Sequence, residues 1–85
     1  MFGKYEDSEV RQFQTERIEA LKSLDIEIFR PFYGKWVAKG MYPTMMSDTL
    51  LEVEMYRQAA KCDRLPTSRK EEAKDWLRHK GYRDA

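Results

Sequence analysis

Apolar positions between residues 50 and 62 recur at the spacing of an α-helix and form two rows. At 100° per residue, one row is Leu50, Val53, Tyr56 and Ala60, and the other is Leu51, Met55, Ala59 and Cys62. A helix with one apolar stripe lies on a surface, whereas a helix that is apolar on two sides is packed from two sides. The pattern therefore predicts a central helix over residues 49–63, with the flanking segments packed around it.

Two other segments have helical periodicity with a single buried side. The apolar residues of segment 8–24 fall on one side of a helix, opposite a charged face. This pattern predicts a surface helix that is capped by Asp7 or Ser8. Segment 68–80 divides into an apolar, a basic and an acidic face, followed by Gly81. Glycine is typical of the position just after a helix, so we expect this helix to end there and the next residue to fold back on its last turn.

Two short patterns predict where helices begin. Thr49 and Glu52 have the spacing of a capping box, in which each side chain bonds the backbone of the other residue. Ser47 is a competing cap for the same helix. Ser68 and Glu71 form a second capping-box pattern, which places the start of the last helix at residues 67–68.

The most aromatic part of the chain contains a proline. Its apolar residues keep helical spacing on both sides of Pro31. A proline costs about 3 kcal/mol in a helix interior and little in the first turn. The sequence therefore predicts a break near Arg30 and a helix over residues 31–39 that ends at Gly40. Gly34 weakens this helix by about 1 kcal/mol relative to alanine.

Together these segments predict an all-α fold. Residues 1–85 form a single domain, a small bundle of about four helices near 8–24, 31–39, 49–63 and 68–80. A chain of 85 residues buries only about two-thirds of its unfolded surface, and small domains often gain stability from a partner or a second copy. Phe2 and Tyr5 further predict that the N-terminal segment docks on the domain.

The charge balance limits the kinds of partner. Sixteen basic and fifteen acidic side chains leave a net charge of +1, which argues against a whole-protein footprint for nucleic acid. The helix–turn–helix outline of residues 51–80 nevertheless suggests an alternative function, a small DNA-binding regulator. Three acidic residues on the last helix, Glu71, Glu72 and Asp75, argue against its being a recognition helix. The nucleic-acid-binding residues of this alternative are Arg69, Lys70, Lys74, Arg78 and Lys80.

The sequence offers little for catalysis, metal binding or a cofactor. His79 is the only histidine and Cys62 the only cysteine, and together they fall short of the four ligands of a structural zinc site. Cys62 belongs to an apolar row, where a free cysteine packs as a small hydrophobic residue. We expect a non-enzymatic protein without cofactor or metal. The single cysteine and the lack of a long apolar run favour a cytoplasmic protein without a membrane span.

Methionines and tyrosines gather in the loop that precedes the central helix. Loop methionines beside aromatic residues are adaptable and frequent at binding surfaces, although they can also cover the core beneath the loop. The methionines and tyrosines exceed what the core needs, and this surplus predicts a protein–protein interaction module, such as a regulator, an inhibitor or an accessory subunit. It would bind another protein chain or a second copy of itself. The predicted protein-binding residues, expected to point outward, are Tyr33, Tyr42, Met45 and Met46.

Overall fold

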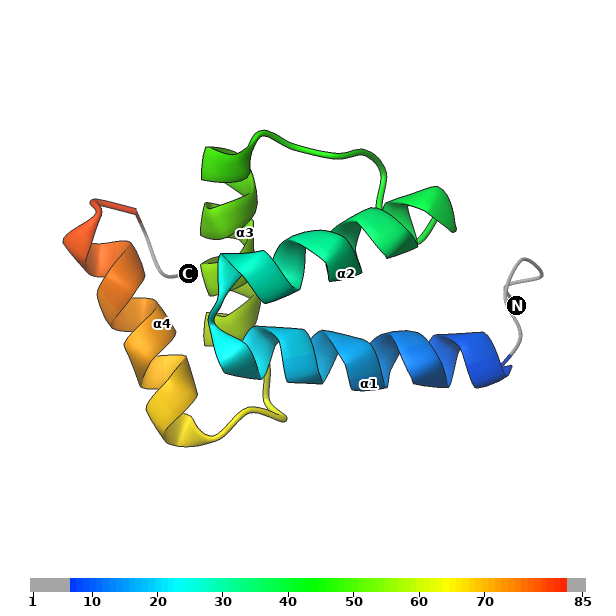
Figure 1. The fold of residues 1–85 in the computed structure, drawn as a ribbon. Coiled ribbons are helices and arrows are strands. Elements are labelled where there is room, and N and C mark those ends of the chain that lie inside the picture. The colour runs from blue at the N-terminus through cyan, green and yellow to red at the C-terminus, as the bar shows by residue number, and fades with distance from the viewer. Residues whose placement is uncertain (1–6, 83–85) are drawn as a thin grey trace.

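The computed structural model describes residues 7–82, which fold into four α-helices (Figure 1). The helices are α1 (Asp7–Ser23), α2 (Ile26–Ala38), α3 (Asp48–Lys61) and α4 (Thr67–His79). No strand occurs among these residues, and the all-α prediction is confirmed. The predicted docking of Phe2 and Tyr5 lies outside the described residues.

Helix α3 is the centre of the bundle, as its two apolar rows predict. It contacts α1, α2 and α4, and Figure 1 shows α1 and α2 side by side with α4 beyond α3. The row from Leu51 to Cys62 is buried throughout. The other row is buried only at Val53 and Ala60, and the prediction was wrong for Leu50, which is 59 % exposed. Leu50 lies in the first turn of α3, ahead of the part of its row that is buried.

The core is built mainly from aromatic and aliphatic side chains of α2 and α3. Trp36 and Val53, both predicted to be core residues, are 0 % and 5 % exposed. The side chain of Phe13 in α1 joins this core through an edge-on contact with Trp36, with ring centroids 5.2 Å apart. The largest fully buried side chains are Trp36, Tyr33, Phe29, Leu21, Leu51, Met55 and Leu77.

Helix α2 runs through Pro31, and the predicted break near Arg30 was wrong. The helix begins at Ile26 because Asp25 is its N-cap and accepts a hydrogen bond from the backbone N–H of Glu27 at 2.9 Å. Pro31 lies just beyond the first turn, so it removes one backbone hydrogen bond. The extra turns bury Phe29 completely, and burial of a phenylalanine is worth roughly 1.5–3 kcal/mol. Capping and burial together offset the cost of the proline.

The N-termini of α3 and α4 differ from the two capping boxes predicted from the sequence. Ser47, the competing candidate, is the N-cap of α3, and its side chain accepts from the backbone N–H of Leu50 at 3.4 Å. Thr49 lies inside the helix. Helix α4 begins after Pro66 and has no side-chain cap, so the box predicted at Ser68 is absent. A proline before the helix fixes the entry of the chain without a capping side chain.

Two glycines end helices in the left-handed conformation that the sequence predicts for them. Gly40 follows α2 with φ 89°, and Gly81 follows α4 with φ 87°. Each is followed by a residue that bonds back into the helix. The N–H of Met41 donates to the carbonyl of Trp36 at 2.8 Å, and the N–H of Tyr82 donates to that of Leu77 at 2.8 Å. These are the bonds of a Schellman motif, and they hold Met41 and Tyr82 against the ends of their helices.

Candidate interaction surfaces

The tyrosines of the predicted contact site belong mainly to the core. Tyr33 is 1 % exposed, so the prediction that it points outward was wrong. Its ring stacks on that of Tyr42, with centroids 4.1 Å apart and planes 16° apart. Residues 39–47 fold back over α2 and bring the two rings together. This pairing depends on the path of the loop, and the helical periodicity around Tyr33 does not reveal it.

Tyr42 and Met46 cover the core as well. The half-buried Tyr42 donates a hydrogen bond from its hydroxyl to Gln58 Oε1 at 3.3 Å, and burial raises the pKa of that hydroxyl. Met46 is half-buried and packs against the core. It directly precedes the N-cap of α3, where an apolar residue commonly packs on the first turns of the helix. Of the four predicted contact residues, only Met45 is well exposed, at 45 %.

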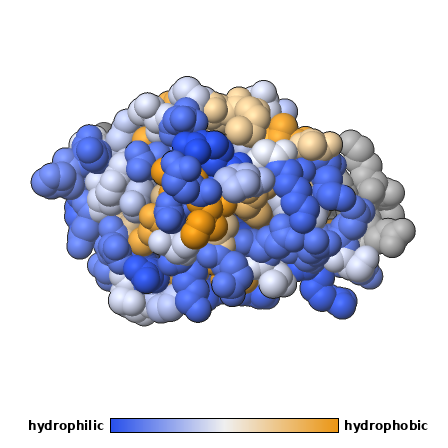
Figure 2. All heavy atoms as spheres, viewed as in Figure 1, coloured by the Kyte–Doolittle hydropathy of each residue, from blue (hydrophilic) through white to orange (hydrophobic). Residues whose placement is uncertain are grey.

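Met45 lies beside an outward face of α2 that carries small, uncharged residues. Pro31, Gly34 and Ala38 share this face by their i, i+3 and i+7 spacing, and Pro31 and Ala38 are exposed. The sulfur of Met45 lies 3.9 Å from the place where a Cβ on Gly34 would be. In Figure 2, apolar atoms lie along the upper edge of the molecule, where Figure 1 places the α2–α3 loop. We call these four residues the α2–loop surface.

Replacing Gly34 by alanine is expected to stabilise the isolated domain by roughly 0.5–1 kcal/mol. Glycine in a helix interior is costly because of its freedom in the unfolded chain. The added methyl group would make only an ordinary contact with Met45 among the described residues. Urea denaturation of the two proteins measures the difference. A loss of stability would mean that this position has no room for a side chain.

The basic residues of α4 pair with acidic neighbours. Arg69 lies 3.0 Å from Glu72, and Lys74 lies 3.7 Å from Glu71. Lys70 pairs with Asp63 at 3.6 Å, and Arg78 with Asp75. Lys80 lies over the ring of Trp76, with its nitrogen 5.8 Å from the centroid. The arrangement resembles a solvated, locally neutral helix surface more than a row of cations that faces a phosphate backbone.

Cys62 and His79 lie in different surroundings. Cys62 is 7 % exposed and belongs to the core. His79 is exposed near the end of α4, and the nearby Asp75 pairs with Arg78. Within residues 7–82, no three His, Cys, Asp or Glu side chains come together in a way that could hold a metal ion. None of the helices in this range is long and apolar enough to cross a membrane.

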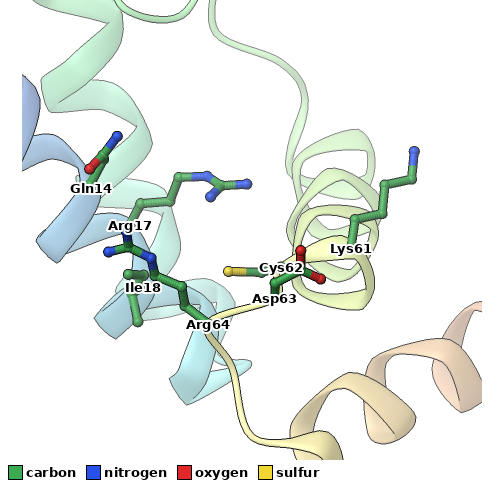
Figure 3. Close-up of a pocket in the computed structure, with 7 residues that line it drawn as sticks. All are labelled: Gln14, Arg17, Ile18, Lys61, Cys62, Asp63 and Arg64. Carbon is green, nitrogen blue, oxygen red and sulfur yellow. The ribbon is translucent and has the colours of Figure 1, made fainter.

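A basic groove between α1 and α3 was not recognised from the sequence. Two adjoining hollows of about 230 and 400 Å³ share Arg17 and Lys61 in their walls. Arg64 adds a cation to the smaller hollow and Arg57 to the larger one. We call these four residues the α1–α3 groove. Figure 3 shows the side chains of Arg17 and Arg64 on either side of the Cys62 sulfur, which points into the space between them.

Gln58 connects the groove to the loop. Its Oε1 accepts from Arg17 Nε at 2.9 Å and from the Tyr42 hydroxyl at 3.3 Å, while its Nε2 donates to Glu54 at 2.8 Å. The amide therefore holds one arginine of the groove in place. Arg17 and Gln58 are 41 positions apart in the chain, so only the tertiary fold reveals this contact.

Comparisons with known proteins find no related protein. No protein-family model matches the chain, and neither a curated protein nor a solved structure matches it significantly.

Proposed function

We propose that this chain is a non-enzymatic protein–protein interaction module of the cytoplasm, which binds a partner chain or a second copy through the α2–loop surface. The observation that carries the proposal is Gly34. A glycine in a helix interior costs about 1 kcal/mol relative to alanine, and no described contact within the domain requires it. A glycine on an outward face permits the close approach of another backbone.

The surroundings of Gly34 support the same function. Met45 is 45 % exposed beside it, and methionine is both adaptable and enriched where proteins meet. Pro31 and Ala38 on the same face are small and uncharged. Backbone bonds at Met41 and Tyr42 to the carbonyl of Trp36 hold the start of the loop, which reduces the entropy cost of docking.

Replacing Met45 by lysine is expected to weaken association by roughly tenfold or more, which corresponds to about 1.4 kcal/mol. A lysine would place a charge in the middle of the contact. Leu50→Lys is the matched control, because Leu50 is exposed at 59 % and lies outside the surface. Sedimentation equilibrium measures self-association, and affinity capture from the native host measures binding of a partner chain. Equal effects of the two variants on association would contradict the proposal.

Gly34→Ala provides a second test, in which domain stability and association are expected to change in opposite directions. This variant is expected to stabilise the isolated domain, as argued above, and at the same time to weaken association, because its methyl group would separate the two backbones. A variant that both stabilises the domain and leaves association unchanged would show that Gly34 has no role in the contact.

The DNA-binding alternative receives less support. Four of its five predicted cations, Arg69, Lys70, Lys74 and Arg78, already pair with carboxylates. Neutralised cations contribute little to counterion release, the main source of affinity for nucleic acid.

A further inference from the structure

The cations of the α1–α3 groove differ from those of α4. None of Arg17, Lys61 and Arg64 forms an ion pair with a described residue, and the same holds for Arg57. The partners of Arg17 and Arg57 are uncharged. Arg17 donates to Gln58, and the guanidinium of Arg57 lies 5.7 Å from the ring centroid of Tyr82. Much of the unneutralised positive charge therefore gathers on this side of the molecule.

The cations come to the groove from two sides. Arg57 and Lys61 are one helical turn apart on α3, about 6 Å along the axis, and Arg64 lies in the segment that follows this helix. Arg17 comes from α1 and is positioned by Gln58. Each of the two hollows also contains one acidic residue. Asp63 already pairs with Lys70, and Glu54 accepts from Gln58, so both carboxylates are engaged.

Cations on two sides of a groove complement an extended chain of anions. The lining of the groove favours a peptide over a nucleic acid. Sites for single-stranded nucleic acid combine basic side chains with aromatic rings on which bases stack. Neither hollow is lined by an aromatic residue. Gln14 and Gln58 supply amide donors and acceptors that suit a peptide backbone. Glutamate and aspartate side chains would form charge-assisted hydrogen bonds with the arginines.

We propose that the α1–α3 groove binds an acidic peptide segment of another protein. Arg17 and Arg64 hold carboxylates on the two sides of the smaller hollow, and Lys61 and Arg57 extend the contact along α3. This binding site goes beyond the α2–loop surface and does not depend on it.

The test uses the full chain and a fluorescein-labelled peptide of alternating Asp and Glu residues, followed by fluorescence anisotropy at low and physiological salt. We expect binding that weakens as the salt concentration rises. The double variant Lys61→Gln, Arg64→Gln is expected to bind at least about tenfold more weakly. Both residues are exposed, so circular dichroism should show an unchanged fold.

The matched control is Arg11→Gln, Lys22→Gln. It removes the same charge from exposed positions of α1 outside the groove, and we expect its affinity to fall by less than about twofold, because distant exposed charges are screened. Met45→Lys is expected to leave peptide binding unchanged, which separates this proposal from the α2–loop surface. The proposal is overturned if the wild type does not bind the peptide at low salt. It is also overturned if both double variants lose equal affinity, or if single-stranded DNA of equal charge binds more tightly.

Discussion

Replacing Trp36 by alanine is expected to lower the free energy of unfolding by about 3–5 kcal/mol. Trp36 is 0 % exposed, and its side chain connects α2 to α1. It lies edge-on to Phe13 of α1, and its indole N–H donates to Glu16 at 3.1 Å. Its removal would leave a large cavity and break the contact between α1 and α2 at the same point.

This loss is large for a domain of 85 residues, whose total stability is on the order of 4–13 kcal/mol. Urea denaturation followed by circular dichroism measures it. Trp36→Phe is the matched control, because it keeps an aromatic ring in the core while it reduces the ring size and removes the N–H. We expect it to lose clearly less stability than Trp36→Ala. An alanine variant with the wild-type denaturation midpoint would contradict the central role of Trp36.

Glu16→Ala is expected to cost about 1–3 kcal/mol, the range for leaving a buried polar group without its partner. The carboxylate of Glu16 accepts hydrogen bonds from three side chains. It accepts from Trp36 Nε1 at 3.1 Å, from Lys35 Nζ at 2.9 Å and from Gln12 Nε2 at 2.8 Å. Without it, the indole N–H of a fully buried tryptophan has no protein acceptor at this position. Urea denaturation at neutral pH measures the change.

The contribution of Glu16 is expected to depend on pH. Hydrogen bonding to Lys35 lowers the pKa of Glu16, and burial opposes this effect. The folded state therefore favours the ionised carboxylate. Its contribution is complete above the pKa of glutamate in the unfolded chain, about 4.3, and is lost as the pH falls through the lower folded pKa.

Glu16→Gln separates the charge of this site from its hydrogen bonds. Glutamine keeps an oxygen for the indole N–H of Trp36 but does not titrate. We expect the wild type to be more stable than this variant at neutral pH and the difference to shrink under acid conditions. A difference that stays constant with pH would show that the charge of Glu16 contributes nothing.

The fold was predictable from the sequence wherever one local signal acted alone. Two apolar rows were enough to place α3 at the centre, and the glycines after α2 and α4 marked the helix ends. The start of α2 was missed because the cost of Pro31 was weighed without the burial of Phe29, which only the tertiary structure reveals. Leu50 was misplaced because periodicity cannot show how far along a helix an apolar row stays covered.

The candidate surfaces were less predictable, since each depends on contacts between distant residues. Tyr33 has the composition of a contact residue but stacks on Tyr42, which the returning loop brings to it. Gly34 was recognised only as a weak point of the helix. The cations of the groove are spread over α1, α3 and the segment after α3, so no stretch of sequence shows them as a cluster.

The arrangement of the helices has a consequence for how fast the chain folds. The most extensive helix contacts are those between sequence neighbours, α3 with α4 and α1 with α2. Each pair is joined by a short connection, of which Leu24 and Asp25 form the shorter one. Closing short loops costs little entropy, and helical proteins dominated by local contacts fold in microseconds to milliseconds. The two hairpins can therefore form independently, and their docking through α3 is the only step that must bring distant parts of the described chain together.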